Sequence, residues 1–170
     1  MASTDDEFER FATAVSPSLL KTARLLTGDW HLAQDLLQTT LAKVYARWGR
    51  SDTWESPVGY ARRVMVNTHC TWYRRMWRHE LPHDVLPERH GGTEAMDTVA
   101  LADALHRALI RLTPRQRAIV VLRYYDDLSV EQTAAVMGCS QGTVLSTTSR
   151  ALAHLRLTPE LGQDNPMERR

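Results

Sequence analysis

The chain of 170 residues is poor in several features that define other classes of protein. Its 2 cysteines, Cys70 and Cys139, lie far apart and give no sign of a disulfide framework, so we expect a reducing compartment, the cytoplasm. The start, MASTDDEFERF, has neither the basic nor the apolar segment of a secretory signal. No apolar run approaches the roughly 20 residues that cross a membrane. These absences predict a cytoplasmic protein with no membrane contact.

Side-chain sets for metal binding and catalysis are also scarce. The 7 histidines are scattered and form no four-ligand zinc pattern, so we expect neither a metal nor another cofactor. No nucleophile and base stand at a recognised catalytic spacing, which predicts that the protein is not an enzyme. A small all-α hydrolase stays open as a rival, because suitable groups are offered by His69, Cys70, Asp84 and His90.

Strand-like alternation is almost absent, and apolar residues recur at helical spacing. The sequence therefore predicts an all-α fold. Residues 81–98 are rich in proline, glycine and charge, a composition typical of a flexible linker. We expect this linker to join two small helical domains, residues 5–80 and 99–157, and we expect the tail from residue 158 to be frayed.

Within the first domain the periodicity predicts three helices. The first covers residues 8–26 and is expected to break or kink at Pro17. The second, over residues 30–48, has one apolar and one polar face. A loop is expected over residues 49–55, followed by a helix over residues 57–78. The apolar stripe of the second helix consists of Ala33, Leu36, Leu37, Thr40, Leu41, Val44, Tyr45 and Trp48.

The most informative segment is residues 113–156, which has the pattern of a helix-turn-helix. Thr113, Ser129 and Ser140 are typical helix-capping residues, and Gly138 suits a left-handed turn between the last two helices. This motif places its last helix in the major groove of DNA. A plain helical hairpin in an ordinary all-α domain is the alternative interpretation.

Helical spacing also assigns inward and outward faces to this segment. The helix that follows Pro114 should pack through Ala118, Val121, Leu122 and Tyr125. The last helix should pack inwards through Val144, Thr148, Ala151, Leu152 and Leu155. Its outer face, which a DNA groove would meet, should hold Thr143, Ser146, Thr147 and Arg150.

The formal net charge is only +1, but arginines gather in two places. Two basic clusters in a neutral chain suggest two separate anionic contacts, whereas solvated helix faces are the usual alternative. The clusters are Arg62, Arg63, Arg74, Arg75 and Arg78, and Arg107, Arg111, Arg115, Arg117 and Arg123.

The segment of residues 67–78 interleaves aromatic, polar and basic side chains. Aromatic faces can hold unstacked bases while guanidinium groups meet phosphates, so the composition suits single-stranded nucleic acid. Packing of Trp72 and Trp77 in a core explains the same composition equally well.

Several stretches resemble one known family. Residues 30–41, WHLAQDLLQTTL, resemble its D-A-x-D-L-x-Q-x-x-F helix, and residues 59–67, GYARRVMVN, resemble its W-L-x-x-I-A-x-N segment. Three further stretches resemble the helix-turn-helix of the same family: residues 112–117 (LTPRQR), residues 128–134 (LSVEQTA) and residues 142–144 (GTV). The family is that of sigma-70-type RNA polymerase sigma factors, in the small extracytoplasmic-function (ECF) group with regions 2 and 4, known from actinobacteria.

The resemblance implies a promoter-specificity factor that binds core RNA polymerase and helps to melt promoter DNA, with an anti-sigma factor as a candidate partner. It assigns docking on the clamp helices of the largest polymerase subunit to Asp35, Gln38 and Thr39. It assigns the minus-10 element, where a base is flipped from the stack, to Asn67, Thr68, Thr71, Trp72, Arg74 and Arg75. It assigns the minus-35 element to Arg123, Gln141, Thr143, Leu145, Ser146, Ser149 and Arg150.

The chain departs from this family in the helix expected to read DNA. Leu145 stands where the family usually has lysine or arginine, and Thr147 where it often has arginine. Leu145 cannot bond a phosphate or a guanine edge, so we expect weaker or differently specified minus-35 reading, with a thymine methyl as one contact open to it. Gly59 or Tyr60 replaces a family tryptophan.

A standalone, dimeric helix-turn-helix regulator is the alternative function. Such a protein binds duplex DNA tightly by itself through two half-sites. A sigma factor whose linker leaves its two domains unorganised should instead need core polymerase.

Overall fold

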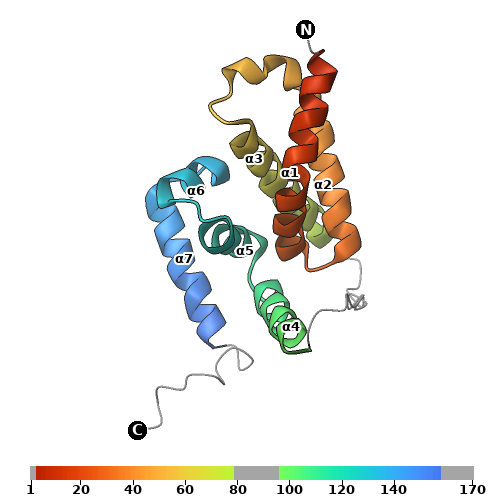
Figure 1. Ribbon diagram of the computed structural model, residues 1–170. Coiled ribbons are helices and arrows are strands. Elements are labelled where there is room, and N and C mark those ends of the chain that lie inside the picture. The colour runs from red at the N-terminus through yellow and green to blue at the C-terminus, as the bar shows by residue number, and fades with distance from the viewer. Residues whose placement is uncertain (1–2, 79–95, 158–170) are drawn as a thin grey trace.

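A computed structural model describes residues 3–78 and 96–157 of the chain, and the described residues are helical with no strand (Figure 1). The first unit consists of α1 (Thr4–Thr27), α2 (Trp30–Tyr45), the 3-10 helix η1 (Trp48–Thr53) and α3 (Pro57–Arg78). The second unit consists of α4 (Met96–Ile110), α5 (Pro114–Val120), the π-helix η2 (Val121–Tyr125), α6 (Val130–Met137) and α7 (Gln141–Arg156). The all-α prediction is confirmed. The expected linker, up to residue 95, and the expected frayed tail lie outside the described residues.

Of the break or kink expected at Pro17, the break is wrong, because α1 continues through this residue. Proline fits the helical φ and removes a single N–H donor. Neighbouring hydroxyls bond locally, Ser16 Oγ to the Ala12 carbonyl at 2.6 Å and Ser18 Oγ to the Val15 carbonyl at 2.9 Å. Val15 and Leu19 are buried against the rest of the unit. Tertiary packing therefore outweighs the local cost of Pro17.

The segment after α2 is a 3-10 helix where the sequence predicted a loop. Its first residue, Trp48, is buried, and the Trp48 ring centroid lies 4.7 Å from that of Phe11 and 5.9 Å from that of Trp54. The Trp54 ring stacks in turn on Tyr60, with centroids 4.1 Å apart. Packing of these rings joins the ends of the helices of the first unit and explains the ordered turn. Tyr45, which the sequence assigned to the buried stripe, is instead 49% exposed.

The caps of the helix-turn-helix agree with the sequence. Thr113 and Ser129 each form a capping box, and the Ser140 hydroxyl accepts a hydrogen bond from the Thr143 N–H. Gly138 has φ of 62°, the left-handed conformation that ends α6.

Two of the predicted faces are wrong in detail. The π-helix changes the register after Val120, so Tyr125 points outwards and is 47% exposed, whereas Val121 and Leu122 are buried. In α7 the buried side chains are Val144, Thr147 and Ala151. Thr147 therefore packs inwards and does not belong to the outer face, because it lies one turn from both Val144 and Ala151.

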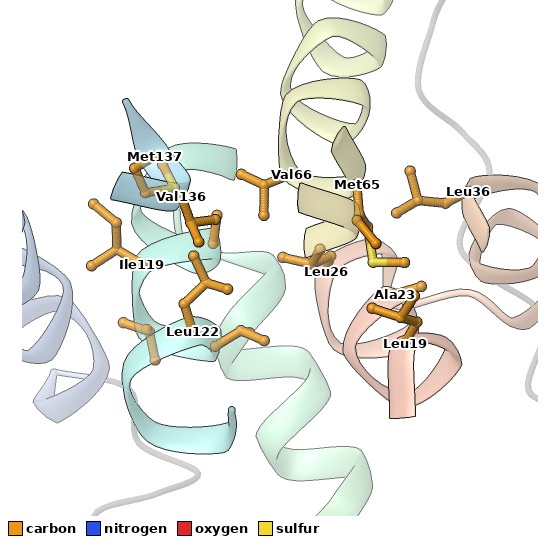
Figure 2. Close-up of a cluster of buried hydrophobic side chains, with 14 of the residues drawn as sticks. Leu19, Ala23, Leu26, Leu36, Met65, Val66, Ile119, Leu122, Val136 and Met137 are labelled. Atoms are coloured by element: carbon orange, nitrogen blue, oxygen red, sulfur yellow. The ribbon is translucent and has the colours of Figure 1, made fainter. Parts of the chain in front are cut away.

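The two units share one continuous core, contrary to the expectation that they are unorganised relative to each other. Figure 2 shows Leu26 and Met65 of the first unit on one side of the junction and Ile119 and Leu122 of the second unit on the other, with Val66 between them. All five side chains are at most 1% exposed. Apolar burial between the units favours their association by the same hydrophobic effect that drives folding.

Candidate nucleic-acid interface

The outer face of α7 is the first candidate surface. Its residues point away from the core, and Leu145 is the most exposed apolar side chain among them, at 58%. The arginines of α7 are Arg150 and Arg156, and both are exposed. The face places on one helix the predicted residues Gln141, Thr143, Leu145, Ser146, Ser149 and Arg150, of which Thr143 is half-buried. It is a mostly neutral, hydroxyl-rich surface.

Arg123 lies apart from α7, in the π-helix η2. Its Nη1 donates a hydrogen bond to the Leu128 carbonyl, and its guanidinium carbon lies 6.0 Å from the centroid of the Tyr124 ring. This half-buried arginine therefore stabilises the turn before α6. The guanidinium has five N–H donors, and those that do not bond the Leu128 carbonyl can donate to a phosphate.

The second candidate surface is the C-terminal half of α3. Asn67, Arg74 and Arg75 are exposed, and Thr71 and Trp72 are half-buried. Trp72 also packs against the hydrophobic core, the alternative that the sequence left open. The exposed amide and guanidinium groups are of the type expected for single-stranded nucleic acid.

Thr68 does not share that surface. It is 2% exposed, and its hydroxyl accepts a hydrogen bond of 2.9 Å from Lys43 Nζ. Thr68 lies one residue past the exposed Asn67, and the 100° step of a helix turns it towards α2. The prediction that Thr68 contacts DNA is therefore not supported by its position; the residue instead ties α3 to α2.

A cavity of about 430 Å³ lies between α3 and the second unit. Asn67 and Arg74 line it from the α3 side, and Thr113, Pro114 and Arg115 line it from the start of α5. Part of the candidate minus-10 surface therefore lies beside the second unit, with Asn67 and Arg74 still exposed.

The third candidate surface is the outer face of α2. Asp35 and Gln38 are exposed and lie one turn apart, while Thr39 is half-buried. The buried side of the same helix packs through Ala33, Leu36 and Leu37. The predicted polymerase-docking residues are thus brought together on the side of α2 that faces away from the core.

Arg117 is the residue whose place the sequence misjudged most. It was grouped with arginines expected to contact anions, yet it is 1% exposed. Its hydrogen bonds go to the carbonyl oxygens of Leu109 at 2.8 Å, Ile110 at 3.0 Å and Leu112 at 3.2 Å in its own unit. Helical spacing could have predicted this burial, because Arg117 precedes the buried Val121 by four residues and therefore lies on the same face of the helix.

Arg117 also reaches into the first unit. Its Nη1 donates to the Leu26 carbonyl at 2.6 Å and to the Tyr73 hydroxyl at 3.4 Å, and its guanidinium lies 5.4 Å from the Tyr73 ring centroid. Leu26 lies in the last turn of α1, where carbonyl groups have no intrahelical donor and the helix dipole is negative. The arginine therefore satisfies the ends of two helices, α1 and α4, one from each unit.

His69 lies beside this contact and is 1% exposed. Its ring centroid is 5.0 Å from that of Tyr73. Burial, with the nearby Arg117 charge as the second cause, lowers the pKa of His69 to about 4. The imidazole is therefore neutral at physiological pH and acts as a packing group.

Asp126 makes a second polar contact between the units. The Thr22 hydroxyl of α1 donates to its Oδ1 at 2.9 Å, and Nε of Arg62 in α3 lies 3.4 Å from its Oδ2. The second distance is that of an ion pair without hydrogen-bond geometry. Burial raises the pKa of Asp126, although Thr22 and Arg62 act in the opposite direction.

The described residues lack two kinds of feature. Residues 3–78 and 96–157 hold no group of three or more histidine, cysteine or acidic side chains arranged for a metal ion. No helix in that part of the chain is long and apolar enough to cross a membrane.

Comparison with known proteins decides the family. The chain matches the model of Sigma-70 region 2 over residues 11–79 and that of Sigma-70, region 4 over residues 102–155. It is 44% identical to the RNA polymerase sigma-E factor of Streptomyces coelicolor, over 88% of this chain and 84% of that protein. It is 32% identical to the ECF RNA polymerase sigma factor SigM of Mycobacterium tuberculosis, over 81% of this chain and 69% of that protein.

The chain belongs to the ECF group of sigma-70 factors. It is a promoter-recognition factor for RNA polymerase, of a family of transcription factors that are not enzymes. The sigma factor RpoE of Bartonella quintana, solved in complex with the anti-sigma factor NepR, has a similar fold. The two structures align with a TM-score of 0.76 and 26% sequence identity, and the alignment covers 93% of this chain and 98% of RpoE.

Proposed function

We propose that the ECF factor divides its work between its two units. The first unit binds core RNA polymerase through α2 and the opened minus-10 element through α3, and the second unit reads the minus-35 element through α7. Residues 5–80 and 99–157 are then the functional domains. The observation that carries this proposal is the presence, on one chain, of three outward-facing sets of side chains on three different helices.

On α2 the proposed docking residues are Asp35, Gln38 and Thr39. The exposed carboxylate and amide offer acceptors and a donor to a basic helical surface, such as a clamp helix of the polymerase. The helix itself is fixed by its buried face, so docking needs no rearrangement of the backbone.

On α3 the proposed minus-10 residues are Asn67, Thr71, Trp72, Arg74 and Arg75. Asn67 has an amide that can read a base edge, and the half-buried Trp72 can stack on an unpaired base. The exposed arginines hold phosphates without regard to sequence. Thr68 is left out because its hydroxyl is bonded to Lys43.

On α7 the proposed minus-35 residues are Gln141, Thr143, Leu145, Ser146, Ser149 and Arg150, with Arg123 as a phosphate contact. Leu145 is 58% exposed and offers only apolar contact, so we assign to it the methyl group of a thymine. Replacing each thymine of the element by uracil tests this assignment. One such change should weaken binding of the holoenzyme by about 0.8 kcal/mol, and the same change should have no effect with a Leu145→Ala variant.

Partners follow from these roles. We propose core RNA polymerase and promoter DNA as the binding partners, with the catalysis of transcription carried out by the polymerase, and the cytoplasm as the place of action. An anti-sigma factor belongs to the proposal because the structurally similar RpoE is bound to one.

Run-off transcription with core polymerase on a library of genomic promoter fragments tests the function. New transcripts that require the protein are expected, and their upstream sequences would give both promoter elements. Tight binding of duplex DNA by a dimer of the free protein, without any new transcript, would contradict the proposal and favour the standalone regulator.

A further inference from the structure

One contact between α2 and α3 has no part in the proposed function so far. Lys43 of α2 donates a hydrogen bond of 2.9 Å from its Nζ to the hydroxyl of Thr68 in α3. Thr68 is only 2% exposed, whereas Lys43 is exposed. The charged end of an exposed lysine is therefore tied to a buried hydroxyl of the helix that is proposed to bind the minus-10 element.

The ammonium group of Lys43 keeps most of its hydrogen-bonding capacity. It has three N–H donors and Thr68 accepts from one of them, so two are left for another acceptor. Holding a long, flexible side chain in one position costs conformational entropy. The bond to Thr68 meets part of this cost before a ligand arrives, and a binding group that is held in place in this way binds more tightly.

The ammonium group lies in the part of α3 that is proposed to bind DNA. Thr68 directly follows Asn67, and Thr71 is about one helical turn further along. The Thr71 hydroxyl accepts a long hydrogen bond of 3.5 Å from Arg74 Nη2. Residues three apart on a helix are neighbours, with Cβ atoms roughly 5–6 Å apart. The charges of Lys43 and Arg74 are therefore held close to each other, each by a threonine of the same helix.

Two cations held close together repel each other unless an anion lies near them. Within residues 3–78 and 96–157, neither Lys43 nor Arg74 forms an ion pair with a carboxylate. A nucleic-acid strand supplies a row of phosphates, which accept strong hydrogen bonds from ammonium and guanidinium groups. The pair of cations therefore fits the backbone of a single strand that passes along α3.

We propose that Lys43 is a phosphate contact for the opened minus-10 strand and that Thr68 is the residue that positions it. The cation comes from α2, outside the segment to which the minus-10 contacts are assigned, so DNA binding on α3 uses a residue of the neighbouring helix. Thr68 then takes part in DNA binding without touching DNA. The inference rests on the proposed role of α3, and the experiment below tests the two separately.

Removal of the lysine charge tests the phosphate contact. The full-length wild type and the Lys43→Gln variant are titrated with a fluorescent single-stranded DNA of mixed sequence at several salt concentrations. Lys43→Gln should bind about threefold more weakly, the scale of an exposed charge contact. Its plot of log K against log salt should be shallower by about 0.7, the value for one phosphate contact on a single strand. Lys21→Gln, at the exposed lysine of α1, is the matched control and should change neither quantity.

Changes at Thr68 test the positioning role. Thr68→Val removes the hydroxyl and keeps the charge of Lys43, so binding should weaken about twofold while the salt dependence stays as in the wild type. Thr68→Ser keeps the hydroxyl and should bind as the wild type does. In the Lys43→Gln background Thr68→Val should cause no further loss, because both changes remove one shared contact. A merely structural role of Thr68 would instead weaken DNA binding equally in both backgrounds and would overturn the positioning. Thr68→Ala is a second variant without the hydroxyl if Thr68→Val loses helical content by circular dichroism.

The remaining outcomes separate the inference from the proposed function. A shallower salt dependence for Arg74→Gln, with that of Lys43→Gln unchanged, would overturn the inference and leave the proposed role of α3 in place. Unchanged salt dependence in both variants would contradict the role of α3 as well. Weaker binding of purified core polymerase by Lys43→Gln, with DNA binding as in the wild type, would overturn the phosphate contact and place Lys43 in the docking surface of α2.

Discussion

The two candidate contact faces of the first unit, on α2 and on α3, differ in what lies opposite them. All four polar side chains, Asp35 and Gln38 on α2 and Asn67 and Arg74 on α3, are exposed, but only those on α3 line a cavity shared with the start of α5. Both faces belong to the same helical unit and were equally visible as polar helix surfaces in the sequence. The difference teaches that two polar faces of one helical unit can have unlike surroundings once the second unit packs beside one of them.

The largest expected effect comes from removing Arg117, which contacts α3 through Tyr73. An Arg117→Met variant leaves four carbonyl oxygens, three buried and one partly buried, without this donor, which should lower the free energy of unfolding by about 3 kcal/mol. Urea unfolding measures the loss. Arg115→Met, two residues earlier and exposed, is the control and should change stability little. Equal losses in the two variants would show that the buried contacts of Arg117 add nothing to stability.

The second-largest effect is expected at low pH, where protonation of His69 in α3 should lower the free energy of unfolding. The pKa of His69 is about 4 in the folded protein and is higher in the unfolded chain, so the unfolded chain takes up the proton first. The stability held by neutral His69 is complete above the unfolded pKa of about 6.5 and is lost as pH falls towards 4. Between pH 7 and pH 4.5 this residue should remove roughly 2 kcal/mol, which a His69→Gln variant would not lose.

Unfolding curves for both proteins at several pH values provide the check on His69. If wild type and His69→Gln lose stability in parallel on acidification, the imidazole does not titrate as its burial requires.

On the α2 face, the Asp35→Ala/Gln38→Ala variant should bind core polymerase more weakly by about 1–2 kcal/mol, since exposed polar contacts at an interface contribute modestly. Single-stranded DNA binding should not change. Affinity measurements with purified core polymerase decide the matter, with Gln34→Ala, on the same helix and also exposed, as the control. Unchanged affinity would remove α2 from the docking surface.

The smallest effect is expected on α7. This helix belongs to the second unit and serves as a reference for the two faces of the first unit. Leu145→Arg should strengthen minus-35 binding of the holoenzyme by about 1 kcal/mol and steepen the dependence on salt by about one counterion. Titrations at several salt concentrations measure both. Leu157→Arg adds the same charge at an exposed position beyond the end of α7 and should do neither. Unchanged binding by Leu145→Arg would contradict the assignment of this residue to the DNA face.

Local signals predicted much of the fold and of the candidate sites. Capping residues such as Thr113 and Ser140 mark helix starts because their side chains satisfy backbone N–H groups within the same turn, and no distant part of the chain is involved. Leu145 was placed on the DNA face by the family resemblance and not by helical spacing, and the structure shows it exposed. The place of Thr147 was missed because an apolar stripe of small and polar residues has poorly defined edges.

The sequence by itself determined the helices, most of their caps, the helix-turn-helix and the family, since each depends on residues close together in the chain or on short motifs. Only the tertiary structure decided that α1 passes through Pro17, that Thr68 faces α2, and that Arg117 and Asp126 join the two units. Arg117 illustrates the reason: its acceptors come from α1, α3 and α4, and one of them, Leu26, is far away in the sequence. A charge is accepted in the interior only where several chain segments bring acceptors to it, and no local pattern records that meeting.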